Sequence, residues 1–361
     1  MKQYFCVGTY TESILFGTGE RFQGKGKGVL ICSLEDGEVT VISTIKVRNP
    51  SYLCLDEAGR KIYAVNEMKE YMGGFGGGVT QLSYDKDWNL TVERTGNTGG
   101  ADPCHIFQDP NHEFLSIANF ASGSVTIVPV NRDGSMDTEH RLLFGHEGKS
   151  IHPVRQQGPH AHATIKVPGE KRLLVPDLGT DTIYSYRYER GCVEADPAGK
   201  ITAPAGSGPR TGVFSQDGRN FYLICEISSQ VIHFQYKNGV MEKQGIFNTL
   251  PEDNTADNIC SDIHLTPDGA YLYASNRGHD SIVSFRVCGD GSLEFIQRQS
   301  CRGKTPRNFA IDPTGTWLLC GNQDSDTISV FAINPDGTLK FKKKAVCETP
   351  ACIRFFHDPP T

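Results

Sequence analysis

The feature that most constrains this chain is a unit of about 50 residues that recurs along it. Each copy reads as a β-strand, a turn rich in Asp and Gly, a second strand, a polar corner and two further strands. The similarity is clearest among "GPRTGVFSQDGRNFYLICE", "SDIHLTPDGAYLYASNRGHDSI" and "PRNFAIDPTGTWLLCGNQDSDTI". A four-stranded unit of this length is the signature of a β-propeller blade.

The number of units predicts how the ring closes. We place the residues that open the first strand of each unit at Pro50, Pro103, Pro159, Pro209, Cys260, Pro306 and Pro350. The last opening is followed by one strand, "ETPACIRFF", whereas "QYFCVGTY", "KGVLICSL" and "VTVISTI" near the N-terminus match second, third and fourth strands. Closure of a ring removes exposed sheet edges. We therefore predict an all-β fold, a seven-bladed β-propeller whose N- and C-terminal strands share a composite blade, as a single domain over residues 1–361.

Composition narrows the possible partners and compartments. A net charge of −6 and a pI near 6.0 argue against nucleic acid as a partner. There is no apolar run of about 18 residues, so we expect no membrane span. The start, "MKQYFCVGTYT", lacks the apolar core of a signal peptide. The 12 cysteines, with no CxxC pair, are typical of small buried side chains. Together these features predict a cytoplasmic protein.

The repeat also separates residues that serve the fold from residues that serve a site, because only the latter need to differ between blades. Two positions differ widely. The residue after each opening is Ser51, Cys104, His160, Arg210, Ser261, Arg307 or Ala351, and the second residue of each polar corner is Tyr10, Glu67, Phe120, Leu178, Glu226, Arg277 or Gln323. The first corner residue is Asn or Asp in most blades, as expected of a turn.

In an antiparallel pair the start of one strand lies beside the end of the next, so both variable positions should face one mouth of the central channel. We expect the catalytic residues to come from His160, His162, Arg210, Glu226 and Arg277. Substrate-binding candidates are Glu67, Arg307, Gln323, Asn276 and Asp262. The arginines outnumber the glutamates, which favours a small anionic ligand bearing carboxylate or phosphate. The alternative is that arginines and glutamates of adjacent blades simply pair and lock the ring.

Two motifs suggest other chemistry. "GPHAH", from Gly158 to His162, could join His152 in a metal site, but zinc usually needs a further carboxylate or cysteine ligand. We expect no metal and no other cofactor, with a metal at these histidines kept as the alternative. "GERFQGKG" imitates a phosphate-binding loop, yet Gly26 follows its lysine and no helix is expected after it. We predict a flexible loop there, able to border a pocket.

The motifs "GPHAH", "PDLGTD", "GPR" followed by a glutamate, "SNRG" and "GNQ" within this frame resemble the seven-bladed propeller lactonase family over nearly the whole chain. The resemblance implies a metal-free reaction on a lactone that bears an acidic group. It also implies an active-site set of one histidine, two arginines and a glutamate, which falls on His160 or His162, Arg210, Glu226 and Arg277. Cys225 stands where the family normally has asparagine before the glutamate, which bears on the orientation of Glu226.

Three functions follow as hypotheses. The first is hydrolysis of a sugar-acid lactone, most readily 6-phosphoglucono-1,5-lactone to 6-phosphogluconate. The arginines would hold the anion and polarise the carbonyl, and Glu226, His160 or His162 would act as general base on water. The second is a lactonizing isomerase acting on a carboxymuconate, since the family includes enzymes that form lactones as well as enzymes that open them. The third is a non-enzymatic binding propeller.

Overall fold

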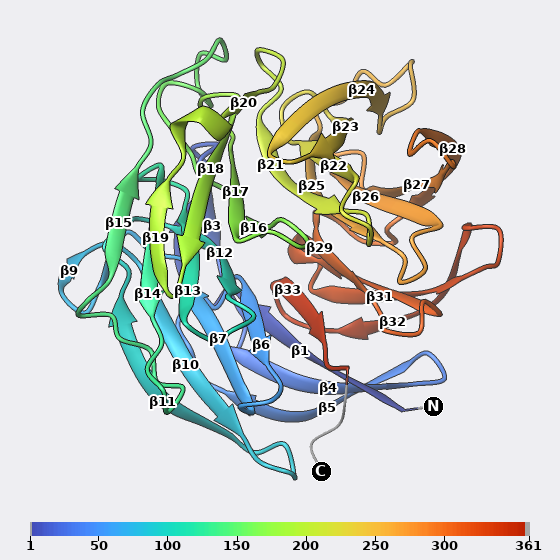
Figure 1. Ribbon diagram of the computed structural model, residues 1–361. Helices are drawn as coiled ribbons and strands as arrows, with labels where there is room; N and C mark the ends of the chain where they lie inside the picture. Colours follow the sequence, from blue (N-terminus) through green and yellow to red (C-terminus); the bar gives the residue numbers. More distant parts are fainter. Residues whose placement is uncertain (1, 358–361) are drawn as a thin grey trace.

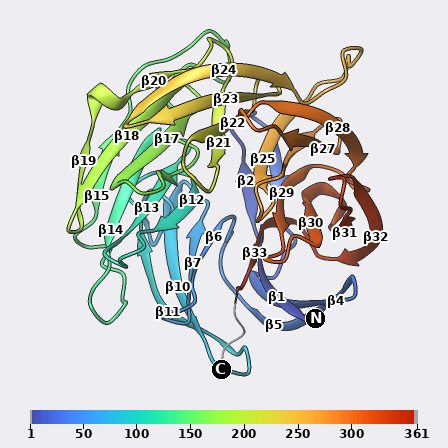
Figure 2. The ribbon, with the colours of Figure 1, turned by 45° about the vertical axis from the view of Figure 1, so that its right-hand side comes forward.

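The computed structural model describes residues 2–357, and over these residues the chain forms seven antiparallel sheets of four or five strands, arranged in a ring (Figures 1 and 2), together with two two-stranded hairpins. Within the same residues, helix is confined to two short 3-10 turns, η1 (Pro197–Gly199) and η2 (Gln323–Ser325). No helix within residues 2–357 is long and apolar enough to cross a membrane.

The ends of the chain meet in one sheet. Strand β33 pairs antiparallel with β1, which pairs with β4, which in turn pairs with β5. The N-terminal strands therefore lie outside the C-terminal one in a composite blade. Its strands are β33 (Pro350–Phe355), β1 (Gln3–Thr9), β4 (Val29–Glu35) and β5 (Glu38–Ile45).

The other sheets, called blades 2 to 7 in chain order, are listed from the innermost strand outward. Blade 2 contains β6 (Leu53–Asp56), β7 (Lys61–Asn66), β10 (Gly78–Tyr84) and β11 (Leu90–Asn97). Blade 3 contains β12 (Pro103–Gln108), β13 (Phe114–Asn119), β14 (Ser124–Pro129) and β15 (Leu142–Gly145). Blade 4 contains β16 (Ile165–Lys166), β17 (Arg172–Asp177), β18 (Thr182–Glu189) and β19 (Cys192–Ala195), and β20 (Ile201–Thr202) also pairs with β18.

Blades 5 to 7 are regular. Blade 5 contains β21 (Pro209–Phe214), β22 (Asn220–Cys225), β23 (Gln230–Lys237) and β24 (Val240–Asn248). Blade 6 contains β25 (Ile259–Leu265), β26 (Tyr271–Arg277), β27 (Ser281–Val287) and β28 (Leu293–Ser300). Blade 7 contains β29 (Pro306–Ile311), β30 (Trp317–Asn322), β31 (Thr327–Ile333) and β32 (Leu339–Val346).

The hydrophobic core lies between neighbouring blades, because each sheet is covered by a neighbour on both faces. Phe5 and Leu30 of the composite blade pack against Leu319 and Val330 of blade 7, and these side chains are almost fully buried. Removal of apolar surface from water at such contacts supplies about 25 cal/mol per Å². The blades are thus held to one another, and the mouth of the channel is built on a rigid frame.

A β-bulge interrupts the innermost strand of five blades where the strand enters the channel. The pairing skips one residue between Pro209 and Thr211, and again between Pro306 and Asn308. Such bulges re-aim side chains and are common beside active sites. The skipped residues, Arg210 and Arg307, are turned out of the sheet ladder toward the channel. The variable position that follows the opening residue is therefore a bulge position in these blades.

The register of blade 4 differs from the predicted one by two residues. Ala161 pairs with Asp177 in the way that Pro209 pairs with Cys225. The backbone N–H of Leu178 correspondingly donates to the carbonyl of His160. The pairing of the innermost segment thus starts at Ala161 rather than Pro159, and His162, not His160, occupies the position equivalent to the bulge residue of the other blades. Pro159 lies two residues earlier, where its ring and carbonyl pack against Gly123 in the neighbouring blade.

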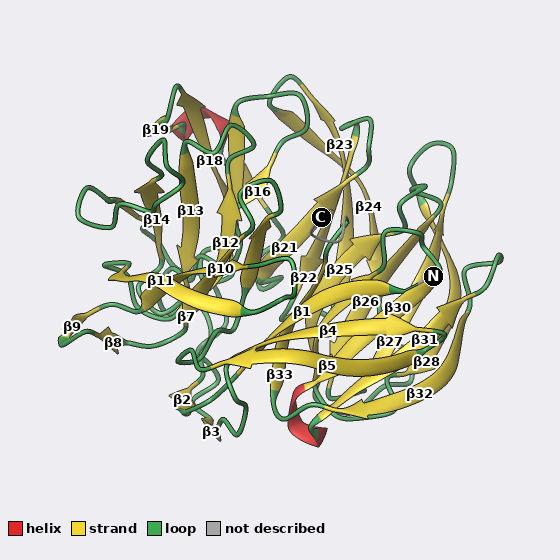
Figure 3. Ribbon diagram, turned by 90° about the horizontal axis from the view of Figure 1, so that it is seen from below, coloured by secondary structure: helices red, strands yellow, loops and turns green. Residues whose placement is uncertain are grey.

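Two hairpins extend from the end of the ring where second strands finish (Figure 3). One is β2 (Ser13–Leu15) with β3 (Arg21–Gln23), and the other is β8 (Glu70–Tyr71) with β9 (Gly74–Phe75). Part of "GERFQGKG" is thus a paired strand rather than the predicted loop. The turn that joins β2 to β3 borders the channel mouth.

Candidate functional site

A cavity of about 210 Å³ opens at this mouth of the channel. It lies where the second strands end and the bulges begin, so side chains from every part of the ring can reach it. Its charged lining residues among those described are Glu20, Glu67, Arg155, Arg210, Glu226, Arg277, Arg307 and Asp324. His162, Cys104, Phe120, Phe16 and Gln323 complete much of the remaining wall.

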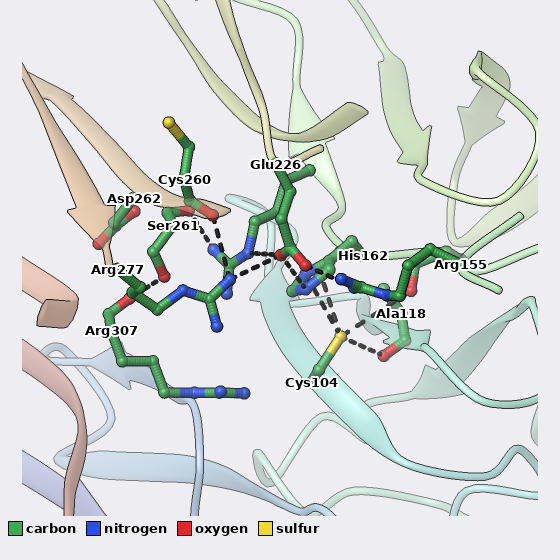
Figure 4. A network of polar contacts seen from close by, with 12 residues as sticks. Cys104, Ala118, Arg155, His162, Glu226, Cys260, Ser261, Asp262, Arg277 and Arg307 are labelled. Atoms are coloured by element: carbon green, nitrogen blue, oxygen red, sulfur yellow. Dashed lines mark hydrogen bonds and ion pairs between the residues drawn. The ribbon is translucent and has the colours of Figure 1, made fainter. Parts of the chain in front are cut away.

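Glu226 lies at the centre of the charged cluster (Figure 4). Its Oε1 accepts a hydrogen bond from Nη2 of Arg155 at 2.5 Å. Its Oε2 accepts from Nε of Arg210 at 2.8 Å and from Nη2 of Arg277 at 2.8 Å. Burial by itself would raise the pKa of Glu226, but the three arginines outweigh burial and hold the pKa well below its ordinary value. Glu226 therefore remains a carboxylate whose lone pairs are occupied by arginines.

Backbone carbonyls of the neighbouring bulge hold two of these arginines in place. Arg277 also donates from Nη2 to the carbonyl of Cys260 at 3.0 Å, and Arg210 donates from Nη1 to the carbonyl of Ser261. The Nε groups of Arg155 and Arg277 are buried and have no hydrogen-bond partner among the described residues. Burial lowers the pKa of Arg277 to about 9. The hydrogen bonds to protein acceptors use only part of the N–H donors of Arg155, Arg210 and Arg277, so the cluster has donors left over for a ligand.

A second acid lies across the cavity. Glu67 accepts a hydrogen bond from the hydroxyl of Tyr10 at 2.6 Å and lies 3.7 Å from Nη2 of Arg307. The guanidinium of Arg307 lies over the rings of Tyr10 and Phe16, each 5.1 Å from its carbon to the ring centroid. Stacking of this kind holds a guanidinium while its N–H groups stay available.

Buried arginines exceed buried glutamates in the inner part of the cavity. Arg155, Arg210, Arg277 and Arg307 line it together with Glu67 and Glu226, whereas Glu20 and Asp324 lie on more exposed segments of its border. Unlike a set of closed pairs, this arrangement leaves positive charge without an acid partner in a desolvated space. A small anion that enters would complete the charge balance and accept the free N–H donors.

His162 is a neutral imidazole in the wall of the cavity. Burial lowers the pKa of His162 well below its ordinary value, and Arg210 lowers it further. Nδ1 of the imidazole lies 3.6 Å from Sγ of Cys104, and Nε2 lies 3.9 Å from Oε2 of Glu226. The second distance is too long for a hydrogen bond. A neutral imidazole in this position can accept a proton near pH 7.

The turn of the first hairpin covers part of the cavity. Phe16, Gly17, Thr18 and Glu20 line it from this side. A side chain at Gly17 would collide with the ring of Phe120, which belongs to blade 3. Glycine therefore allows the hairpin of the composite blade to reach across the mouth, and this close contact reduces the access of water to the charges beneath.

Most of the predicted site residues converge on this cavity. His162, Arg210, Glu226, Arg277, Glu67, Arg307 and Gln323 all line it. Cys225 does not disturb Glu226, because the N–H of Glu226 still donates to the carbonyl of Gly208 at 2.7 Å. The N–H of Phe120 makes the same bond to Asp102 in blade 3. The geometry of the corner is therefore set by the backbone.

Three predicted residues lie elsewhere. His160 stacks on Phe120 with ring centroids 4.5 Å apart, and its Nδ1 donates to the carbonyl of Phe120 at 2.9 Å. Asn276 is fully buried and donates to the carbonyl of Thr249 at 3.2 Å, as a corner residue that ties two blades together. Asp262 lies deeper in the channel, where it lines two smaller or more distant cavities instead. Burial within the repeat, which pattern alone does not reveal, explains Asn276 and Asp262, and the register of blade 4 explains His160.

Residues that the prediction missed also line the cavity. Arg155 arrives from the loop before blade 4, where its N–H donates to Nδ1 of His152 at 3.1 Å. A loop residue has no equivalent in the other blades, so the repeat could not reveal it. Cys104 and Phe120 stand at variable positions of the repeat. Their side chains carry no charge or acid–base group, so nothing in the sequence singled them out as site residues.

The metal alternative finds little support in the geometry. Within residues 2–357 no group of three or more His, Cys, Asp or Glu side chains is arranged to hold a metal ion. Nδ1 of His152 accepts backbone N–H groups, and Nδ1 of His160 faces a carbonyl. These two imidazoles therefore do not converge with His162.

The fold and the site together define a class, the seven-bladed propellers that carry an arginine-rich cavity at one mouth of the channel. The family model for lactonases with a seven-bladed β-propeller matches residues 4–355, and the chain belongs to this family.

Several characterised or solved relatives are similar over most of their length. A 6-phosphogluconolactonase of Bacillus subtilis is 31% identical over 314 residues, which cover 85% of this chain and 84% of the relative. A 6-phosphogluconolactonase of Formosa agariphila is also 31% identical, with 85% of each chain covered. The solved structure of a periplasmic gluconolactonase of Pseudomonas aeruginosa superposes with a TM-score of 0.89 at 30% identity and covers 100% of both chains.

Proposed function

We propose that this protein hydrolyses 6-phosphoglucono-1,5-lactone, or a closely related sugar-acid lactone with an anionic group, to the open acid. The observation that carries the proposal is the excess of buried arginines around His162, whose hydrogen bonds to protein acceptors leave N–H donors unused. The names of the Bacillus and Formosa relatives support the phosphorylated substrate.

The arginines would bind the anionic group of the substrate and polarise its lactone carbonyl. Arg155, Arg210 and Arg277 share one carboxylate, Glu226, so their guanidinium groups are held in fixed directions before the substrate binds. N–H donors aimed at the carbonyl oxygen stabilise the negative charge that develops as water adds. Arg307, held over Tyr10 and Phe16, is suited to the substrate's phosphate or carboxylate.

We assign the general base to His162 rather than Glu226. Both oxygens of Glu226 are occupied by arginines and its pKa is held well below its ordinary value, so it is a poor proton acceptor. His162 is neutral and borders the cavity. In the proposed reaction the imidazole removes a proton from water while the oxygen attacks the lactone carbonyl. The ring C–O bond then breaks, and the imidazolium gives its proton to the departing alkoxide oxygen, which becomes a hydroxyl.

Two further points belong to the proposal. The reaction needs no cofactor, since arginines supply the electrophilic assistance. We also propose that the protein acts in the cytoplasm. All 12 cysteines of the chain are free thiols in the structure, and most are buried, which suits a reducing compartment.

The test is an assay of the purified protein, treated with a chelator, on freshly prepared 6-phosphoglucono-1,5-lactone with a coupled dehydrogenase as readout. We expect a rate far above spontaneous hydrolysis, and a loss of about a hundredfold or more in kcat/KM for Arg277→Gln. A rate equal to the spontaneous one would contradict the assignment. A carboxymuconate or unphosphorylated gluconolactone tested in parallel would then identify the substrate class.

A further inference from the structure

The opposite mouth of the channel holds a second cavity, of about 460 Å³. It is lined by the far ends of the innermost strands, including residues of β6, β12, β21, β25 and β33. Between the two mouths lies a cavity of about 20 Å³, which is large enough for one water molecule and too small for a substrate. A ligand in the opposite mouth would therefore bind separately from one at His162.

Arg354 presents a free edge in this second cavity. Its Nη1 donates to the carbonyl of Ile353 at 2.8 Å, and its guanidinium carbon lies 4.3 Å from the ring centroid of Tyr52. Among the described residues, the bond from Nη1 is the hydrogen bond that the guanidinium makes, so Nε and Nη2 are left over. No ion pair within 4.0 Å is formed there, although the charge of Asp262 acts on Arg354 from a greater distance. These two groups form the edge of a guanidinium that binds a carboxylate with two parallel hydrogen bonds.

Further donors surround Arg354. The ring of Tyr52 lies 4.2 Å from that of His105, so the three side chains form one stack. Nδ1 of His105 accepts the N–H of Thr164 at 3.3 Å, and burial lowers the pKa of His105 to about 3, so Nε2 carries the proton and donates. The hydroxyls of Tyr52 and Thr211 also line the cavity and have no hydrogen-bond partner among the described residues.

The acids that line this cavity are already occupied. Asp262 accepts from Nε2 of His264 at 2.9 Å and from the amide of Asn308 at 2.5 Å. Glu57 lies 2.8 Å from Nδ1 of His357. Burial alone would raise the pKa of Asp262, but the charge and hydrogen bond of His264, together with the charges of Arg354 and Arg210, outweigh it and bring the pKa to about 2. The ionised Asp262 would repel a dianion more strongly than a monoanion.

We propose that the opposite mouth is a second ligand site, for a small hydroxylated monocarboxylate held by Arg354 through its Nε and Nη2, with Tyr52, Thr211 and His105 as further donors. This site lies apart from that of the proposed reaction, because none of these four residues lines the cavity at His162.

The test is a titration of the full-length protein, labelled with ¹³C at histidine Cε1, with gluconate and, separately, with inorganic phosphate. His105 and His264 report on the opposite mouth and His162 reports on the other, after assignment by single histidine variants. We expect gluconate to shift the signals of His105 and His264, and Arg354→Gln to weaken that response by about tenfold or more. Arg298→Gln is the matched control, because Arg298 also lies 4.3 Å over a ring, that of Phe295 on an outer strand.

If Arg354→Gln fails to fold, Thr211→Val removes one donor and should weaken the same response by a few-fold. Signals of His105 and His264 that gluconate leaves unmoved in the unmodified protein would overturn the site. An equal response in Arg354→Gln or in Thr211→Val would overturn it as well. A stronger response to phosphate than to gluconate would overturn the choice of a monocarboxylate.

Discussion

The two mouths of one channel are built from the two ends of the same innermost strands, yet their charges are arranged differently. At the mouth that contains His162, several arginines share Glu226 and leave N–H groups unused. At the opposite mouth the buried carboxylate, Asp262, is matched by His264 and Asn308, and one arginine stands apart. The comparison shows that the candidate active site differs in having several arginines gathered on one carboxylate, whereas the opposite mouth has, among the described residues, a single arginine without an ion pair.

The largest difference should appear when each mouth loses its central carboxylate. Glu226→Gln leaves Arg155, Arg210 and Arg277 buried against one another, so we expect kcat/KM to fall by about a hundredfold or more and stability to fall by about 3–5 kcal/mol. Asp262→Asn should lower stability by less, because fewer full charges are left unpaired, and should lower activity by less than tenfold. Lactonase kinetics and urea unfolding of both variants measure these quantities. Equal losses of activity would remove the distinction between the mouths.

A smaller effect on the free energy of unfolding should come from a change in pH, since each mouth holds a buried neutral histidine. The folded-state pKa of His162 lies well below its ordinary value and that of His105 is about 3, both because of burial. Unfolded histidines take up protons near pH 6.5, so this contribution to stability is complete above that pH and is lost as the pH falls below it. We expect a loss of up to about 1.4 kcal/mol per pH unit for each histidine. Unfolding at several pH values should show a shallower slope in His105→Gln.

The activity should follow a different pattern over the same range. A base with a lowered pKa stays unprotonated in mild acid, so kcat/KM should remain constant from neutral pH to well below pH 6.5. His162→Gln should lower kcat by about a hundredfold or more. His105→Gln should lower kcat much less, because His105 does not line the cavity at His162. A profile that falls with a midpoint near the ordinary histidine value would contradict the neutral state of His162 in this cavity.

The smallest effect on activity should come from a change in the β2–β3 hairpin, which covers part of the mouth that contains His162. Gly17→Ala pushes the hairpin away from Phe120, and we expect KM to rise several-fold with a smaller change in kcat. Gly145→Ala is the control, because a Cβ there meets nothing within 4 Å. Steady-state kinetics of the two variants would decide. An unchanged KM in Gly17→Ala would show that the hairpin does not contribute to substrate binding.

The repeat made most of this architecture predictable. A unit that cannot bury its own faces must stack against copies of itself, so the period alone predicted the blades, and the comparison of equivalent positions predicted Arg210, Glu226, Arg277 and Arg307. The prediction was wrong by two residues in blade 4, because Pro159 resembles the proline that opens other blades. Hydrogen bonds between strands determine register, and a proline at either position satisfies the same sequence pattern.

The sequence by itself therefore determined the features that follow from the repeat: the all-β class, the seven units, the family and the positions that vary from blade to blade. The tertiary structure decided what is not repeated. It placed Arg155 against Glu226 from a loop, selected His162 over His160, and brought Gly17 to Phe120 from a distant blade. The physical reason is that local pattern dictates strands and turns, whereas burial, register and contacts between distant blades determine which charges meet.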